Sequence, residues 1–349
     1  MICPAKLTYH GNAGQAVSVI PFSDEQIRTV INLQQHYEVW MDADRSLAQL
    51  PYGLKWADRN GKDYLYELFD RIGNGKSLGP RSAETERIFD SYRERKAELT
   101  ERRNRSAVTL SQTCKVYRAL GLPLLPSEAA KILREADRRS LLGSHLMVVG
   151  TNALAAYALE INGRIDGAPE ETDDFDMAWL TVDDPSSPDV PVWALLKAVD
   201  STYTVNSERT FQARNAAAYE VELLAAPSRR MSRRDRPVPV PLPEQEWLLP
   251  GTRISRVAVA RDASPARVVA PDPRWFALQK LWMSDQEKRH AGKRPKDLKQ
   301  GTALLACIHE ALPSHSLNAP DFLAAMPPEL QPYYDRFAAP YTEDALPNW

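Results

Sequence analysis

The stretch LMVVGTNALAAYALEI, residues 146–161, decides the fold class of this chain. Four apolar residues followed by Gly150 are typical of a short buried strand that ends in a tight turn. The alanine-rich residues after the turn predict a helix that begins at Thr151. Gly150 has no side chain, so the backbone of the turn can approach a phosphate group closely. Thr151 offers a hydroxyl at the N-terminus of the helix, where unpaired N–H groups also favour an anion. The stretch therefore predicts a strand, a phosphate-binding turn and a helix in succession.

Two acidic segments follow this turn, and each lies in a predicted strand. The segment TDDFDM places Asp174 and Asp176 two residues apart, so both carboxylates project from the same face of a strand. The segment YEVELL, on a second strand, adds Glu222 as a third acid, with Glu220 on the same strand face as the alternative. Clustered carboxylates repel one another unless divalent cations lie between them, and Mg²⁺ prefers carboxylate, water and phosphate oxygens. The spacing therefore predicts a site for two Mg²⁺ ions about 4 Å apart, which would activate a hydroxyl nucleophile and stabilise a leaving pyrophosphate.

The length and composition limit the architecture. The chain has 349 residues, enough for two or three domains of roughly 100–200 residues each. Hydrophobic residues make up 43%, charged residues 26% and the net charge is −2, which excludes a mostly disordered chain, a fibrous chain and a globally basic one. We predict an α/β fold with three parts: a helical N-terminal domain over 1–140, a small mixed-sheet core over 141–270 and a helical C-terminal domain over 271–349.

The N-terminal part is predicted to be mainly helical. Helical periodicity supports this in the segment 64–69 and in the charge-dense segment 82–105. The residues Gly73–Ser77 resemble part of a P-loop, but Asp70 stands where the first glycine of that motif would be needed. We therefore expect a turn after a helix at this point.

Cysteine usage and hydropathy predict where the protein works. The three cysteines lie far apart and form no CxxC pair, so neither a zinc site nor a disulfide framework is expected. The first residues, MICPAKLTYHGNAG, lack the apolar stretch of a signal peptide, and no segment approaches 18 apolar residues. We expect a cytoplasmic protein with no membrane partner.

Taken together, the glycine turn, the D-hydrophobic-D segment and the later acid resemble the nucleotidyltransferase superfamily that includes DNA polymerase β. More narrowly, the chain resembles a group of bacterial nucleotidyltransferase-like proteins. Its turn is Gly-Thr where the superfamily usually has Gly-Gly or Gly-Ser, and its third acid is Glu222 where aspartate is commoner. The matching segments are GNGKSLGPRSAETE (73–86), VVGTNALAAYA (148–158), TDDFDM (172–177), ARNAAAYEVELL (213–224), DPRWFALQKLWMSD (272–285) and KRPKDLKQ (293–300).

The resemblance implies a fold, an activity and a set of site residues. The core would be a polymerase β-like palm, and the enzyme would move a nucleoside monophosphate from an NTP such as ATP to a hydroxyl acceptor. The implied catalytic and metal-binding residues are Asp174, Asp176 and Glu222, with Mg²⁺ as the cofactor. The implied nucleotide-binding residues are Gly150, Thr151, Asn152, Arg214 and Lys280.

The acceptor is predicted from a basic segment that follows the second acidic strand. Five arginines lie within eight residues, and arginine pairs readily with phosphate oxygens, so we expect an RNA acceptor, with tRNA as the first candidate. A solvated loop is the alternative interpretation of the segment. A small-molecule acceptor such as an aminoglycoside, and a non-catalytic module that binds a protein partner through its helices, are the alternative functions. The resemblance also suggests a toxin–antitoxin or defence role. The predicted nucleic-acid-binding residues are Arg229, Arg230, Arg233 and Arg234.

Overall fold

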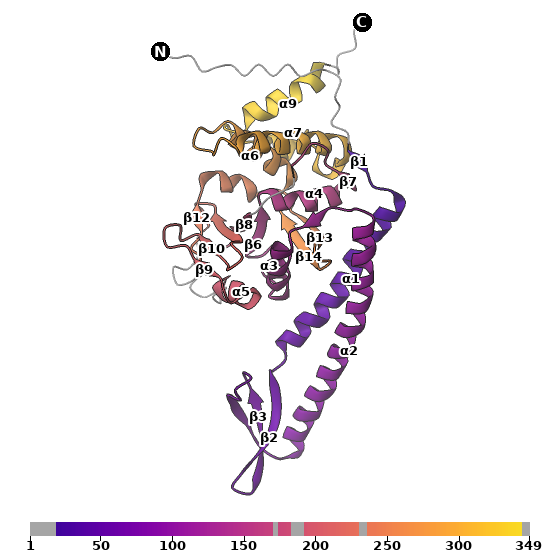
Figure 1. Cartoon of the computed structure of the whole chain (residues 1–349), viewed down its shortest axis with the longest axis vertical. Coiled ribbons are helices and arrows are strands. Elements are labelled where there is room, and N and C mark those ends of the chain that lie inside the picture. The colour runs from indigo at the N-terminus through magenta and orange to yellow at the C-terminus, as the bar shows by residue number, and fades with distance from the viewer. Residues whose placement is uncertain (1–18, 170–173, 183–191, 230–235, 344–349) are drawn as a thin grey trace.

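The strand, turn and helix predicted from residue 146 onwards form as expected. Strand β6 (Leu146–Val149) is fully buried, and Gly150 leads into a single 3-10 turn, η1 (Thr151–Ala153), that continues as helix α4 (Leu154–Glu160). The computed structural model describes residues 19–169, 174–182, 192–229 and 236–343. In Figure 1 these residues form a core and an arm that projects from one side of it.

A mixed sheet of six strands positions the acidic residues. β6 runs antiparallel to β8 (Asp174–Trp179), and β8 runs parallel to β11 (Glu220–Ala225). Strand β10 (Gln212–Arg214) pairs antiparallel with β11, and β9 (Thr204–Val205) pairs with β10. The sixth strand, β12 (Val240–Pro241), pairs parallel with β11. The predicted small mixed sheet is therefore confirmed.

A second sheet and several helices pack around the central one. The hairpin of β13 (Ile254–Ala260) and β14 (Pro265–Ala270) is extended by β5 (Leu124–Leu125), and helices α3 and α4 contact this sheet. Helix α3 (Ser127–Arg138) also packs on α5 (Val192–Val199). A two-stranded ladder joins β1 (Ile20–Pro21) to β7 (Gly163–Arg164).

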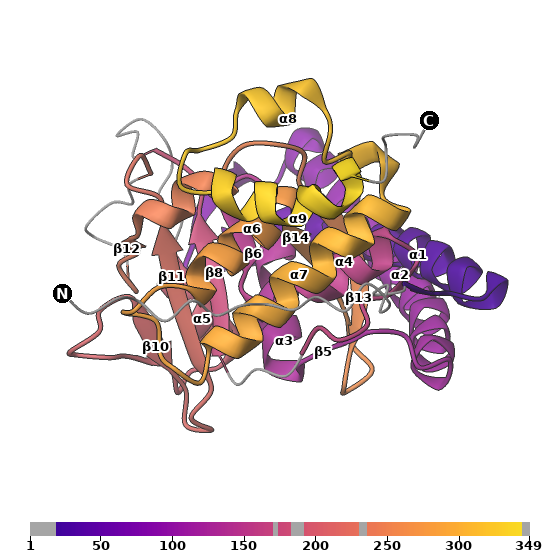
Figure 2. The same cartoon turned by 90° about the horizontal axis from the view of Figure 1, so that it is seen from above.

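The C-terminal part is helical, as predicted, and covers one side of the core. Helices α6 and α7 pack against each other, and Figure 2 shows them with α9 as layers over the sheets. The elements are η2 (Pro243–Leu248), α6 (Pro273–Ser284), α7 (Arg294–Ala311), η3 (Pro313–His315), α8 (Pro320–Ala324) and α9 (Gln331–Glu343). One cluster of buried apolar side chains runs from Phe22 to Tyr334 and includes residues of all three predicted domains. The division at 140 and 270 stays a prediction.

The arm consists of a long helical hairpin with a small sheet at its far end (Figure 1). Helix α1 (Asp24–Gln49) leads into it, and helix α2 (Ala83–Ala119) returns to the core. Between them lies an antiparallel sheet in the order β2 (Gly53–Arg59), β3 (Lys62–Leu68) and β4 (Gly75–Pro80). The predicted charge-dense helix over 82–105 is confirmed and continues to Ala119.

The helical interpretation of residues 64–69 is wrong, because residues 64–68 lie in strand β3. Asn60 and Gly61 join β2 to β3 in a two-residue turn with φ values of 55° and 77°. Positive φ at both positions is the requirement of a type I′ hairpin turn, for which Asn-Gly is the preferred dipeptide. This local signal outweighs the short apolar run that also fits a helix. Accordingly, the segment Gly73–Ser77 follows a strand rather than a helix. Gly73 and Asn74 lie in the connection from β3, and Gly75 begins strand β4.

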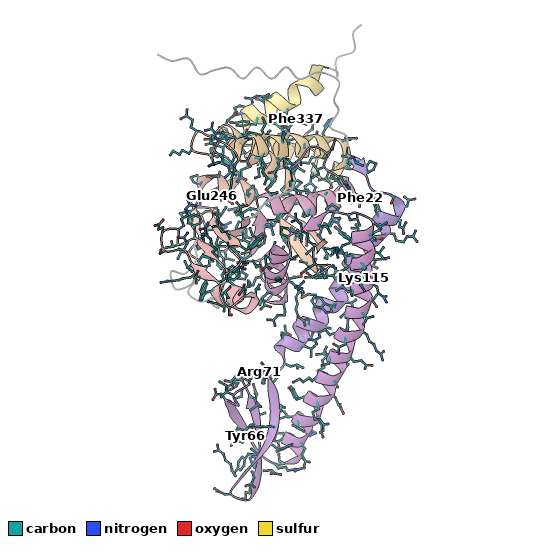
Figure 3. The ribbon with its side chains drawn as sticks, viewed as in Figure 1. Phe22, Tyr66, Arg71, Lys115, Glu246 and Phe337 are labelled. Atoms are coloured by element: carbon teal, nitrogen blue, oxygen red, sulfur yellow. The ribbon has the colours of Figure 1, made fainter. Side chains whose placement is uncertain are left out.

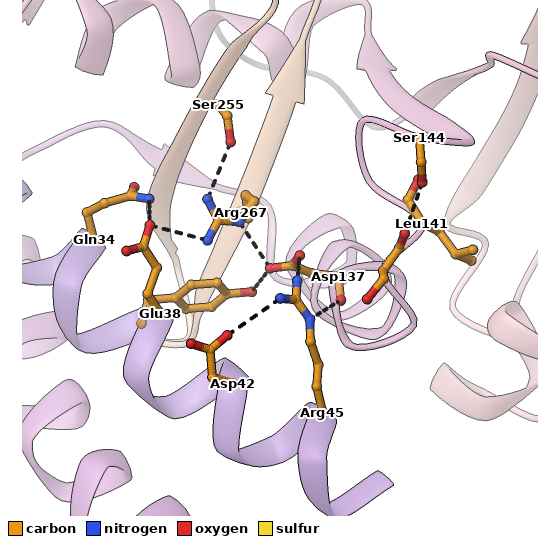
Figure 4. A network of polar contacts seen from close by, with 11 residues as sticks. Gln34, Glu38, Asp42, Arg45, Asp137, Leu141, Ser144, Ser255 and Arg267 are labelled. Carbon is orange, nitrogen blue, oxygen red and sulfur yellow. Dashed lines mark hydrogen bonds and ion pairs between the residues drawn. The ribbon is translucent and has the colours of Figure 1, made fainter. Parts of the chain in front are cut away.

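A buried polar network joins the arm to the core (Figure 4). Asp137 of α3 is only 2% exposed, and its carboxylate accepts hydrogen bonds from Tyr37 of α1 at 2.8 Å and from Arg267 of β14 at 3.3 Å. Arg45 of α1 pairs with the same carboxylate and donates to its main-chain carbonyl at 2.9 Å. Burial and the adjacent Asp137 raise the pKa of Tyr37 well above its ordinary value, so the phenol stays a donor. The network therefore fixes the second half of α1 against α3 and β14.

Candidate active site

The Gly150 turn lies against the carboxylate of Asp176. Gly150 has φ of 76°, and a Cβ placed on it would lie 2.3 Å from Oδ2 of Asp176. Any other residue would therefore clash with the acid and strain the backbone, so glycine is required on two counts. The turn thus places the start of η1 beside the acidic strand.

The register of β8 and β11 places four carboxylates on one face of the sheet. Glu220 lies opposite Asp174, and Glu222 lies opposite Asp176, in a parallel pair. Side chains two residues apart on a strand share one face of the sheet. The register therefore brings the three predicted acids and Glu220 together on that face. Gln212 of β10 donates to Glu220 at 2.9 Å and to Glu222 at 3.1 Å, which holds both carboxylates in place.

Burial and mutual repulsion set the proton affinity of these acids. Burial, together with the charges of Asp174 and Glu222, raises the pKa of Asp176 to about 7, while Lys280 and Lys293 oppose the rise. Burial and the charge of Asp174 also raise the pKa of Glu222 above its ordinary value. Two neighbouring acids that resist ionisation mark a place where more positive charge would be stabilising.

Lysines from the C-terminal helices supply part of that charge. Lys293, at the start of α7, donates to Oδ2 of Asp174 at 2.9 Å. Burial acts to lower the pKa of Lys293, but the hydrogen bond and the charge of Asp174 outweigh it, and the net shift is upward. Burial and the charge of Lys280 lower the pKa of the neighbouring Lys296. The ammonium of Lys293 therefore acts as a built-in counter-ion to Asp174.

Lys280 forms a buried ion pair with Asp297. Its side chain is 5% exposed, and its ammonium lies 2.8 Å from Oδ1 of Asp297. The other oxygen of Asp297 accepts from Arg289 at 2.8 Å. One carboxylate of α7 thus fixes Lys280 of α6 and Arg289 of the connection between the two helices, and the charge of Lys280 still lowers the pKa of Asp176.

Thr151 and Asn152 are both buried and hydrogen-bonded. Asn152 donates to the main-chain carbonyl of Asp174 at 3.3 Å, which joins the turn to β8. The hydroxyl of Thr151 accepts from Gln300 of α7 at 3.3 Å, so its own proton is left to donate. A cavity of about 330 Å³ opens beside Thr151 and Asn152, and Arg164 and Arg261 also line it, which suits an anionic group.

The donor set fits a hard divalent cation, although the side chains are not already gathered around one. In the described ranges no group of three His, Cys, Asp or Glu side chains is arranged to hold a metal ion. The chemistry nevertheless fits Mg²⁺, because only carboxylate oxygens are offered and two of the acids have raised pKa values. Lys293 would have to leave Asp174 for Oδ2 of that carboxylate to become a ligand.

The remaining predicted residues lie in different surroundings. Arg214, on β10, forms an ion pair with Glu220, so its guanidinium lies beside the acids of β11. Arg229 is partly buried, and its Nε has no hydrogen-bond partner among the described residues. It lies near enough to Arg253 to lower the pKa of that guanidinium, after the larger effect of burial. The predictions for Arg230, Arg233 and Arg234 lie outside the described residues.

A glycine turn beside in-register acids on a mixed sheet, with helical flanks, defines an α/β protein of the nucleotidyltransferase class. A family profile described as nucleotidyltransferase matches residues 127–321, more than half of the chain. The chain therefore belongs to this nucleotidyltransferase family, and we describe it as a nucleotidyltransferase from here on.

Two further comparisons complete the findings. The crystal structure of an antigenic nucleotidyltransferase-like protein from Paracoccidioides brasiliensis is similar with a TM-score of 0.34 and 17% identity, covering 63% of this chain and 92% of that chain. No curated protein matches the sequence. In the described ranges, no helix has the length and hydropathy needed to span a bilayer.

Several residues of the site were missed from the sequence. Lys293 lies in a matching segment, KRPKDLKQ, but had no role assigned, because a lysine at the start of a helix usually faces solvent. Its signal is the density of cations over 289–296. Gln212 and Gln300 carry no signal of their own, since neutral amides occur throughout the surface of globular proteins.

Proposed function

We propose that this nucleotidyltransferase is of the polymerase β type and transfers a nucleoside monophosphate from an NTP to a hydroxyl acceptor, with release of pyrophosphate. The observation that carries the proposal is the register of β8 and β11, which aligns Asp174 with Glu220 and Asp176 with Glu222 beside the Gly150 turn. The alternative is a glycine that only caps a helix near acidic strand ends. That arrangement would not require the turn to lie so close to Asp176 that only glycine fits.

The acids and the cofactor have separate tasks in this proposal. Asp174, Asp176 and Glu222 would hold two Mg²⁺ ions, which when bound supply Lewis-acid stabilisation of the charge on the phosphoryl oxygens. Glu222 would in addition accept the proton of the acceptor hydroxyl, because burial raises its pKa and makes it a stronger base. Gln212 keeps Glu222 oriented through its hydrogen bond.

The turn and the lysines would bind the triphosphate. The free hydroxyl proton of Thr151 can donate to a phosphate oxygen, and the bare Gly150 allows the close approach. Lys293 would move its ammonium from Asp174 to a phosphate oxygen, which frees Asp174 at the same time. Lys280 would remain on Asp297 and act at longer range, where its charge favours the ionised form of Asp176.

We propose RNA as the acceptor, with tRNA tested first. The support is the arginine-rich sequence over 229–236, of which Arg229 is described and is partly buried. A small aminoglycoside is cationic and would instead be attracted by uncovered carboxylates, whereas two of the four acids, Asp174 and Glu220, are already paired with Lys293 and Arg214. The acceptor is thus expected to be an anion.

The experiment compares the four labelled NTPs with Mg²⁺ and purified tRNA or total RNA. Covalent label on RNA, lost in Asp176→Ala and retained in the exposed control Asp90→Ala, supports the proposal. Equal labelling by wild type and Asp176→Ala would overturn it. Label that appears only on small molecules of a lysate would keep the reaction and refute the RNA acceptor.

A further inference from the structure

The arm's small sheet separates its charges between its two faces. β2 and β3 pair in antiparallel register, so Trp56 lies opposite Leu65 and Asp58 lies opposite Asp63 on one face, and Glu67 shares it. On this side Leu65 is fully buried, and the ring of Trp56 lies 5.8 Å from that of Phe89 of α2. This face therefore packs toward α2 and carries all three carboxylates of β2 and β3.

The other side of β2 and β3 we call the open face. It carries Lys55, Arg59, Lys62, Tyr64 and Tyr66, together with the apolar Ala57 and Leu68, and none of these strand residues is acidic. The three cations are exposed and the two tyrosines are half-buried. The guanidinium of Arg59 lies 5.4 Å from the centroid of the Tyr66 ring, so cation and aromatic ring are interleaved.

The cations of the open face have no acidic partners among the described residues, although ion pairs are common elsewhere on the arm. Lys76 pairs with Glu67, and Arg81 pairs with Asp63 and Glu86, all away from the open face. Asp58 and Asp63 adjoin Arg59 and Lys62 in sequence but lie on the other face of the sheet. Asp70, in the connection from β3 to β4, accepts hydrogen bonds from its own loop at Ile72 and Gly73. The open face thus keeps its positive charge.

The combination of unpaired cations and partly exposed tyrosines matches a single-stranded nucleic acid. Cations in such sites neutralise phosphates, and aromatic rings stack on bases without regard to sequence. An acidic peptide would use the cations alone. A groove of about 920 Å³ along α2 offers no comparable match, because its lining mixes acids such as Asp90 and Glu94 with cations such as Arg93 and Lys96.

We propose that the open face of the arm binds a single-stranded segment of the RNA acceptor. The choice of RNA over DNA rests on the proposed function; the basic, aromatic character of the face does not depend on it. In Figure 3 Tyr66 lies in the arm's sheet and Arg71 at the end of that sheet nearer the core. Arg71 is exposed and adds a cation at this end of the sheet, so RNA held on the arm could continue toward the core.

The test measures binding without catalysis. A fluorescein-labelled single-stranded RNA of about 12 nucleotides, a length within the usual site sizes, is titrated with full-length protein in EDTA and without NTP. The charge variant is Lys55→Glu/Arg59→Glu/Lys62→Glu. Its matched control, Arg102→Glu/Arg105→Glu/Lys115→Glu, reverses three exposed cations of α2 and changes the net charge equally.

Loss of three phosphate contacts should weaken binding at least ten-fold and reduce the slope of log affinity against log salt by about 2. The α2 control should lose much less. The stacking variant Tyr64→Leu/Tyr66→Leu should weaken binding about five-fold or more per lost base contact, with the salt slope unchanged. Tyr66→Phe keeps the ring and should bind normally, which separates stacking from damage to the sheet.

Three results would overturn the proposal. The first is normal RNA binding by the charge variant, and the second is an equal loss in the α2 control, which would reduce the effect to net charge. The third is a wild-type dimer in sedimentation that the charge variant converts to monomer, since the face would then bind a second copy. Because no NTP or metal is present, a protein that binds as expected but transfers no label would refute the proposed function and leave this inference standing.

Discussion

Replacing Asp176 with asparagine should stabilise the metal-free protein at pH 8 while it abolishes the proposed reaction. Folding raises the pKa of this carboxyl from an ordinary 3.8 to about 7, through burial and the charges of Asp174 and Glu222. A group whose pKa rises on folding stabilises the protein in its protonated form. That stability is present below about pH 4 and is lost as the pH rises to about 7.

The magnitude follows from the interval between the two pKa values. At about 1.4 kcal/mol per pH unit, the ionised Asp176 costs up to about 4 kcal/mol of folding free energy at pH 8. Asparagine has the same shape and no charge, so Asp176→Asn should regain about 2–4 kcal/mol at pH 8 and almost nothing at pH 4. Urea unfolding followed by tryptophan fluorescence at both pH values measures the difference.

Two controls make the result interpretable. Asp90→Asn removes an exposed carboxylate of α2 and should change stability by less than about 0.5 kcal/mol at either pH. Mg²⁺ should stabilise the wild type at pH 8 and have little effect on Asp176→Asn. A variant that is less stable than the wild type at pH 8, or equally altered at both pH values, would show that folding does not raise the pKa of Asp176.

Three more predictions test the turn, the counter-ion and the arm's attachment. Gly150→Ala should lower the free energy of unfolding in urea by at least about 2 kcal/mol, because of the positive φ and the clash with Asp176. The control Gly167→Ala, at a position with φ of 73° and open space, should lower it by only about 1 kcal/mol. Equal costs would show that the close approach of Gly150 to Asp176 does not matter for stability. Lys293→Met should raise the KM for NTP about ten-fold in a label-transfer assay. The control Lys299→Met, on the exposed side of α7, should leave the KM unchanged. An unchanged KM in Lys293→Met would exclude triphosphate binding by Lys293. Asp137→Ala removes the buried carboxylate that Tyr37, Arg45 and Arg267 share and should cost about 3–5 kcal/mol, against less than about 1 kcal/mol for the exposed Asp42→Ala. Similar costs would mean that the network does not hold the arm.

The core could be predicted from the sequence because its signals are local. The apolar run before Gly150 and the alternation over Glu220–Ala225 are short patterns that burial on one sheet enforces. Two acids on each of two strands share a face by strand geometry alone, so their grouping needed only that the strands be neighbours. The predicted return to helix after Pro273 is confirmed by α6 and α7.

The rest depends on partners that are distant in sequence. Nothing local to Asp137 shows that Tyr37, Arg45 and Arg267 will converge on it, and nothing local to Lys293 shows that α7 will bring it to Asp174. The arm's sheet was mispredicted for a different reason. The Asn60-Gly61 dipeptide is a local signal for a hairpin turn, but the short apolar run after it also fits a helix. Once residues 62–67 are assigned to strand β3, Lys62, Tyr64 and Tyr66 fall on one face of the sheet. Asp63, Leu65 and Glu67 fall on the other face.

The most direct measurement compares two positions of the label in the same NTP. The purified protein is incubated with Mg²⁺, tRNA and NTP labelled at either the α- or the γ-phosphate, and RNA and pyrophosphate are counted separately. Nucleotidyl transfer at this site predicts α-label on RNA in equal amount to γ-label in pyrophosphate, with both absent in Asp174→Asn and Asp176→Asn. γ-Label on the acceptor, or α-label transfer that survives both substitutions, would contradict nucleotidyl transfer at this site.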